Sequence, residues 1–165
     1  TVNRSGSTFD VTINSASRKD DPTTKENEAG LPYVGIGVDT SYVAPFDITF
    51  SLRDVGGPSA GMMFSLAIID RLTPGALTAG KTIAGTGTID PQGNVGPIGG
   101  IQQKMIGAKK GGAELFLAPA ENCDEVVGHV PNGMTVAEVS TLSDAVKAIE
   151  AFTSGGTVTG CKSSK

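Results

Sequence analysis

The fold class is decided by residues 83–122, which read IAGTGTIDPQGNVGPIGGIQQKMIGAKKGGAELFLAPAEN. The glycine-broken apolar run 83–89 predicts a strand, and the Asp-Pro-Gln-Gly-Asn turn after it leads into a second strand at 95–98. Residues 101–110 predict a helix, with lysines in its last turn and glycines after its end. The apolar run 113–117 predicts another strand. A strand, a helix and a further strand in this order are typical of the α/β class.

The same alternation of elements continues on both sides of this stretch. Strands and helices alternate from residue 46 onward, so the fold class is α/β or α+β. The helix expected at 60–72 is apolar on nearly all sides, which predicts burial. Asn122 and Glu125 have the spacing of a helix cap, and they predict the start of a short helix. The remaining expected elements are strands at 9–13, 34–38, 46–50 and 134–139 and a helix at 142–152.

The composition is ordinary for a globular protein, with 38% apolar and 18% charged residues. A chain of 165 residues is long enough for one domain with a hydrophobic core. Acidic residues outnumber basic ones by 17 to 13, and the basic residues form no continuous stripe. Both observations argue against nucleic acid as a partner. No stretch approaches the roughly 20 apolar residues of a membrane span. Because the sequence begins at Thr1 with no signal-like segment, we expect a fragment that has lost any targeting element.

The pattern also predicts how the chain is divided. Residues 18–32 are charged, contain proline and show no periodicity, so they are expected to form an exposed loop or linker. Small and polar residues after the last expected helix predict a flexible tail. We therefore expect an N-terminal part with its linker at 1–32, a main domain at 33–153 and a tail at 154–165.

Ser59 lies in the glycine-rich turn Gly-Gly-Pro-Ser-Ala-Gly at 56–61. The pattern G-x-S-x-G can present a nucleophilic serine on a sharp turn. The alternative is that this stretch is an ordinary turn between a strand and a helix. A catalytic triad needs an acid and a histidine as well. His129 is the only histidine, and the acids before it, Asp124 and Glu125, lie on its own short helix or loop. We therefore reject a triad and assign His129 no role.

Lys104 is expected on the apolar face of its helix. It shares that face, at spacings of three, four and seven residues, with Ile101, Met105 and Ala108. Burial disfavours the charge of a lysine, and a neutral amine can take the proton of a serine. The alternative is that the side chain extends to solvent along its apolar stem. Paired with Ser59, the buried interpretation predicts a serine-lysine hydrolase.

A phosphate-binding pattern, G-x-x-x-x-G-K-[ST], is complete at 75–82. Such a loop requires a strand before it and a helix after it, so that a helix N-terminus faces the phosphate. Here a helix is expected before the pattern and a glycine-rich strand after it. A nucleotide-binding protein is therefore only an alternative, and no cofactor is expected.

The two cysteines, Cys123 and Cys161, have no metal-ligand spacing, and no metal site is expected. They are either two unrelated thiols or one bridge that ties the C-terminal tail to the domain. A bridge would require an oxidising compartment.

The stretch from Gly56 to Asn122 resembles the proteolytic domain of the Lon protease family. GGPSAG is similar to the nucleophile motif of that family, and 83–122 to its segment with the catalytic lysine. The shared elements of this segment are Thr-Gly, Pro-Ile-Gly-Gly, the lysine and Leu-x-Pro-x-x-Asn. The resemblance implies that Ser59 is the nucleophile, that Lys104 is the general base and that Thr86 forms hydrogen bonds near the lysine. The residues around the nucleophile that would support it are Gly57, Pro58 and Ala60.

The sequence departs from the family at two positions. Many members have an acidic residue where this chain has Gly56, and many have Glu where it has Thr88.

Residues 1–13 bear a weaker resemblance to the final hairpin of a PDZ domain. This order is similar to bacterial PDZ-Lon proteins, which have no ATPase module. That resemblance implies a membrane-anchored parent protein on the extracytoplasmic face of a bacterial cell membrane, and it is compatible with a ring of identical copies.

The residues and the resemblance together predict a serine endopeptidase with a Lon-type proteolytic domain and a short N-terminal remnant of a PDZ domain. It would cleave unfolded or exposed polypeptides with Ser59 and Lys104, independently of ATP. The alternative from another class is a non-catalytic Lon-like binding or assembly module.

Overall fold

The structure is a computed structural model that describes residues 1–4, 6–17, 30, 32–34, 47–50 and 57–162. The chain divides into two units, Thr1–Phe50 and Ser51–Lys165. Among the described residues, no helix has the length and apolar character needed to cross a membrane.

Among its described residues, the first unit contains two small antiparallel pairs of strands. The strands β1 (Val2–Arg4) and β2 (Ser7–Phe9) form a hairpin. The strands β3 (Ala16–Ser17) and β4 (Pro32–Tyr33) form the second pair. Two-stranded pairs of this size have little stability without a hydrophobic face packed against another layer.

The strand expected at 9–13 is wrong beyond Phe9. Val11 and Ile13 lie outside any strand and are about half exposed, at 46% and 53%. Alternation of apolar residues produces a strand only where another strand and a core are available. The expected strands at 34–38 and 46–50 lie largely outside the described residues, and Ile48 is exposed with no strand structure. Gly56 and most of the linker expected at 18–32 also lie outside the described residues.

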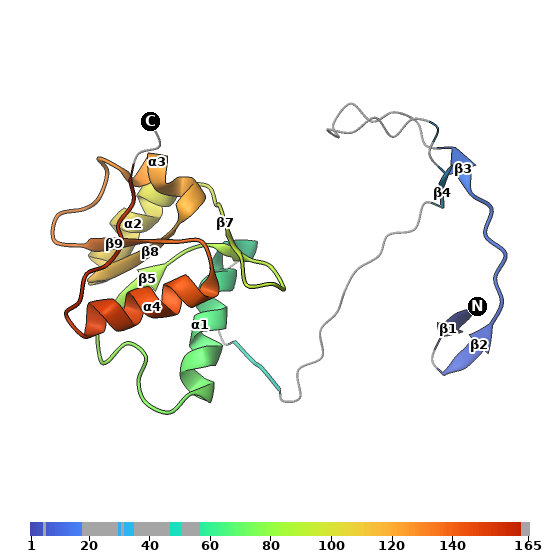
Figure 1. The fold of residues 1–165 in the computed structure, drawn as a ribbon, viewed down its shortest axis with the longest axis horizontal. Coiled ribbons are helices and arrows are strands. Elements are labelled where there is room, and N and C mark those ends of the chain that lie inside the picture. The colour runs from blue at the N-terminus through green and yellow to red at the C-terminus, as the bar shows by residue number, and fades with distance from the viewer. Residues whose placement is uncertain (5, 18–29, 31, 35–46, 51–56, 163–165) are drawn as a thin grey trace. The chain divides into compact units, whose positions relative to one another are not determined.

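The second unit is built on a three-stranded parallel sheet (Figure 1). Its strands are β5 (Ile83–Gly85), β8 (Leu115–Pro119) and β9 (Thr135–Val139), with β8 in the middle. A short antiparallel pair, β6 (Thr88–Ile89) and β7 (Val95–Gly96), stands beside this sheet. The helices are α1 (Gly61–Leu72), α2 (Ile101–Lys110), α3 (Cys123–Val126) and α4 (Leu142–Thr153). The expected mixed α/β class is confirmed.

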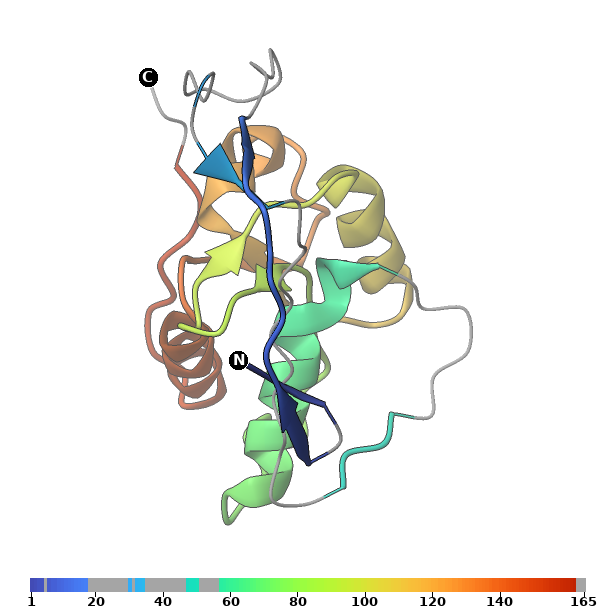
Figure 2. The ribbon, with the colours of Figure 1, turned by 90° about the vertical axis from the view of Figure 1, so that its right-hand side faces the viewer.

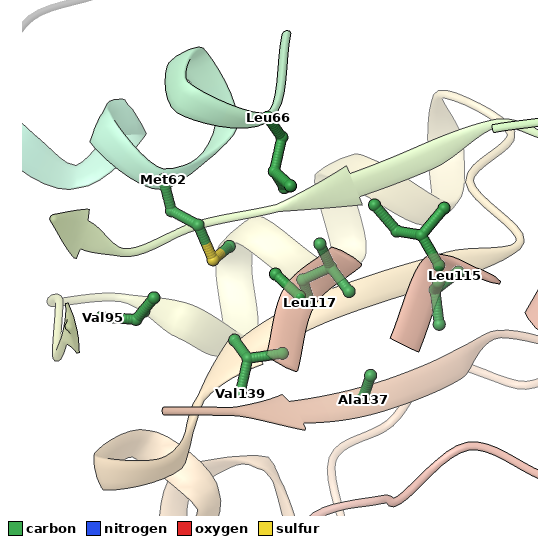
Figure 3. Packing of buried hydrophobic residues seen from close by; sticks show 9 residues of the cluster. Met62, Leu66, Val95, Leu115, Leu117, Ala137 and Val139 are labelled. Atoms are coloured by element: carbon green, nitrogen blue, oxygen red, sulfur yellow. The ribbon is translucent and has the colours of Figure 1, made fainter. Parts of the chain in front are cut away.

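Helices cover both faces of the parallel sheet, as Figures 1 and 2 show. The side chains of β8 alternate between the faces. Leu115 and Leu117 pack with α1 and α4, whereas Phe116 and Ala118 pack with α2 and α3. In the first cluster, Met62 and Leu66 point from α1 toward the strands (Figure 3). The two cores fix α1 and α2 on opposite faces of one rigid sheet.

The helix α1 is less buried than its sequence predicted. Only Met62 and Leu66 are fully buried, and Leu72 is 59% exposed. The prediction of burial on all sides is therefore wrong. The helix packs against the strands and α4 through Met62 and Leu66, and most of its other residues stay partly exposed.

The boundaries of several predicted elements shift by a few residues. The helix α2 spans the predicted residues 101–110. The predicted strand 83–89 is divided into β5 and β6, because Thr86 and Gly87 turn the chain toward Ser59.

The C-terminal segment differs from the expected flexible tail. The backbone N–H of Glu138 in β9 donates to the carbonyl oxygen of Thr159, and Val158 packs against the first core cluster. A disulfide joins Cys123 to Cys161, with 5.0 Å between their Cα atoms. Of the two interpretations of the cysteines, the structure therefore has the bridge.

Asp90 closes the turn between β6 and β7. Its Oδ1 accepts hydrogen bonds from the backbone N–H groups of Gln92 and Asn94, and its Oδ2 accepts one from the side chain of Asn94. The bond from the Asn94 side chain is the largest cause that lowers the pKa of Asp90 below its ordinary value of 3.8. The ionised carboxylate therefore stabilises the folded turn.

Replacing Asp90 with Asn is expected to lower the stability of the protein at neutral pH. The pKa of Asp90 is lower in the folded state, so its contribution is present above about pH 3.8 and is lost as the pH falls through the lowered pKa. Urea unfolding of both proteins between pH 7 and pH 2 measures this contribution. The gap in unfolding free energy should narrow in acid, and a gap that is constant with pH would contradict the argument.

Candidate active site

A short 3-10 helix, Pro58–Ala60, places Ser59 immediately before α1. Gly57 begins this turn with φ 79° and ψ 170°, a backbone conformation that glycine adopts without strain. Pro58 occupies the first helical position, where its missing N–H costs nothing. Ser59 is half-buried, and the structure shows no acceptor for its backbone N–H among the described residues. A backbone N–H at the start of a helical segment is a donor suited to an anionic oxygen.

The backbone of Ser59 is anchored by the link between β5 and β6. Its carbonyl oxygen accepts hydrogen bonds from Thr86 Oγ1 at 2.9 Å and from the backbone N–H of Gly87 at 2.8 Å. Thr86 is only 2% exposed, and its own N–H donates to Leu117 in the central strand. The sequence predicted Thr86 beside the lysine, whereas its hydroxyl bonds to the backbone of the serine. Thr86 thus connects Ser59 to the rigid sheet.

Lys104 lies on the second turn of α2, with its Nζ 3.4 Å from Ser59 Oγ. Two glycine-rich motifs 45 residues apart are thereby brought together. The contact is longer than a well-formed hydrogen bond, as is common for catalytic pairs without substrate. Gly100, with φ 72°, turns the chain into α2 just before the helix begins.

The expectation of a buried lysine is wrong. Ile101 and Met105, its neighbours on the same helix face, are fully buried, but the side chain of Lys104 is exposed. Its long apolar stem lets the amine extend beyond the core boundary, as the alternative interpretation held. Among the described residues, no carboxylate forms an ion pair with Lys104.

Asn122 is a site residue whose contacts the sequence did not predict. Its Oδ1 accepts from the backbone N–H of Ile98 at 3.0 Å, and its Nδ2 donates to the Ile98 carbonyl oxygen at 2.9 Å. The short helix α3 does begin directly after Asn122, as predicted, but the Asn122 side chain bonds to none of its backbone N–H groups. Its Nδ2 also donates to Glu125 Oε1. The available signal was a polar residue soon after a fully apolar strand, within the segment Leu-x-Pro-x-x-Asn.

The phosphate-binding pattern has no suitable context in the structure. It connects α1 to β5, so a strand follows it instead of a helix. Its lysine, Lys81, forms an exposed ion pair with Glu114 at 2.9 Å. In the described part of the chain, no group of three or more metal-ligating side chains is found. His129 is exposed, and its ring nitrogen Nδ1 lies 3.2 Å from the carbonyl oxygen of Val127 in its own loop.

The family model of the Lon protease (S16) C-terminal proteolytic domain matches residues 53–151. The Lon proteases of Azospirillum brasilense and Brucella suis biovar 1 are each 36% identical to this chain over 94 residues, which are 55% of the chain and 11% of each relative. The Lon protease of Rickettsia bellii is 33% identical over 94 residues, 57% of the chain and 12% of that relative. The chain thus spans about a tenth of the length of these relatives. Since the family model covers well over half of its residues, the chain belongs to the Lon protease (S16) C-terminal proteolytic domain family.

Proposed function

We propose that this protein is a serine endopeptidase that cleaves unfolded or exposed polypeptides with a dyad of Ser59 and Lys104. The observation that carries the proposal is the 3.4 Å approach of Lys104 Nζ to Ser59 Oγ. Membership of a protease family supports the same reaction class, as do the relatives named Lon protease. Neither a metal nor a cofactor is needed for this chemistry.

In the proposed mechanism, the neutral amine of Lys104 accepts the hydroxyl proton as Ser59 Oγ attacks the peptide carbonyl carbon. The C–N bond then breaks, and the proton passes from the lysine to the departing amine. Water attacks the resulting ester and gives a proton to Lys104; the C–O bond then breaks, Lys104 passes this proton to Ser59 Oγ, and the acid product, the serine and the neutral amine are released. The backbone N–H of Ser59, at the start of a helical segment, would stabilise the oxyanion.

The exposure of Lys104 adds one requirement to this mechanism. Only the neutral amine accepts a proton, so activity should rise with pH. A polypeptide bound across Ser59 and Lys104 would exclude water from the amine and disfavour its charge. The dyad would then be activated most strongly in the presence of substrate.

A second candidate is a non-catalytic Lon-like binding or assembly module. The exposure of Lys104 and the length of its contact with Ser59 favour this candidate. Incubation of the protein with casein, with and without ATP, separates the two functions. The proposal predicts cleavage at the same rate in both samples, whereas intact casein would favour the binding module.

We also propose that residues 1–32 are the remnant of a PDZ domain with its linker, and that the proteolytic domain occupies 33–153. The hairpin of β1 and β2 is compatible with such a remnant. The Cys123–Cys161 disulfide supports an oxidising location, such as the extracytoplasmic face of a bacterial membrane. The membrane-anchored parent and a ring of copies complete this proposal, and external protease treatment of intact source cells would test the location.

A further inference from the structure

Asn122 and Thr86 are the two polar side chains that are fully buried among the described residues. Thr86 holds the backbone of Ser59, as described above. Asn122 is 3% exposed, and its oxygen and nitrogen both bond to the backbone of Ile98. A buried amide group without hydrogen bonds lowers the stability of the fold. The two bonds therefore hold the segment around Asn122 to the segment around Ile98.

The segment that contains Ile98 leads directly into α2. It connects β7, which ends at Gly96, to the first helical residue, Ile101. The backbone of Ile98 is bonded through both its N–H and its carbonyl, so it can neither slide nor rotate freely against Asn122. A further hydrogen bond, from Gln102 Nε2 to the carbonyl oxygen of Glu125, holds the first turn of α2 to the helix α3.

The start of α2 determines where Lys104 lies. A helix moves as a rigid body, so a shift or rotation at its first turn is transmitted to the next. Lys104 approaches Ser59 only at 3.4 Å, and little displacement is needed to separate their side chains. A misplacement of about 1 Å at a catalytic group can cost roughly 100-fold in rate.

We propose that Asn122 is a positioning residue, which holds the start of α2 through Ile98 and so keeps Lys104 within reach of Ser59. This inference rests on the proposed function of the dyad. Asn122 acts through Ile98, and no contact with a substrate is needed for its effect.

The test is the rate at which a fluorophosphonate labels Ser59 in the 165-residue chain. Asn122→Ala removes both contacts with Ile98 and should lower the labelling rate constant by about 100-fold. The double variant Asn122→Asp, Glu125→Gln keeps the acceptor for the Ile98 N–H, and when its new carboxyl group is ionised it has no donor for the Ile98 carbonyl oxygen. At an alkaline labelling pH, at which this carboxyl group is ionised, the double variant should also label more slowly than the wild type, and it serves as the second variant if Asn122→Ala does not fold.

Two control variants separate positioning from general stability. Glu125→Gln alone keeps an acceptor for Asn122 and leaves the contacts with Ile98, so it should label like the wild type. Thr141→Ala removes the capping box of α4 and destabilises the protein, but it leaves the two hydrogen bonds between Asn122 and Ile98 in place. It should label at the wild-type rate.

The final extent of labelling distinguishes the two roles of Asn122. Positioning predicts a lower rate constant with about one label per chain at the end, whereas a merely structural role predicts fewer labelled chains at an unchanged rate constant. If the folded double variant labels at the wild-type rate at that pH, the positioning role of Asn122 is overturned and the proposed function of the dyad still stands. A wild-type protein that is not labelled at Ser59 would overturn the proposed function, and the inference with it.

Discussion

Replacing either Ser59 or Lys104 with Ala is expected to lower casein cleavage by about 10³-fold or more. The serine supplies the oxygen that forms the acyl-enzyme, and the lysine removes its proton. Since the two act as one unit, the double variant should be no worse than either single variant. Initial rates on a fluorescent casein substrate, with the wild type alongside, provide the measurement.

The control for this prediction is the fold of each variant. Ser59 is half-buried and Lys104 is exposed, so neither truncation removes a core side chain, and thermal unfolding should change little. Lys104→Arg is a second control, because arginine keeps the positive charge but does not give up its proton. It should be as inactive as Lys104→Ala. Substantial activity in a folded Ser59→Ala or Lys104→Arg protein would rule out the dyad.

Removing the disulfide is expected to cost about 4 kcal/mol of unfolding free energy. The bridge closes a loop between residues 38 positions apart, and the chain-entropy relation gives this value for a loop of that length. Its loss would also release the segment that bonds to β9 through Thr159. Urea unfolding of the double variant Cys123→Ser, Cys161→Ser, compared with the wild type, measures the cost.

The same prediction can be checked without a variant. Unreduced, denatured wild-type protein should contain no titratable thiol, because both cysteines are bonded. After reduction, two thiols should appear and the protein should unfold at a lower urea concentration. Two thiols before reduction, or equal stability before and after it, would contradict the prediction.

The elements of the second unit could be predicted where local patterns and the core agree. The helix α2 was predicted at its observed bounds, because apolar residues at helical spacing precede a glycine stop. The strands β8 and β9 were found to within two residues for a related reason, since a buried strand needs an apolar run. The first unit was predicted less well. The alternation of Val11 and Ile13 does not specify a partner strand, and the structure gives them none.

The site was predictable in its residues but less so in its environment. Helical periodicity correctly placed Lys104 on the same side as Ile101 and Met105, but it fixes only the direction of the Cα–Cβ bond. The amine lies several bonds farther out, and it reaches solvent. The contact between Asn122 and Ile98 joins residues 24 positions apart. Local spacing contains no sign of such a bond, and the sequence offered a helix cap as the simpler interpretation.

The central claim is that Lys104 activates Ser59 as a nucleophile. Its most direct test is peptide mapping by mass spectrometry after the wild type and Lys104→Arg have been treated with a fluorophosphonate. The account predicts a label on Ser59 in the wild type, faster labelling as the pH rises, and almost no label in Lys104→Arg. A label on another serine, or equal labelling of Ser59 in Lys104→Arg, would contradict it.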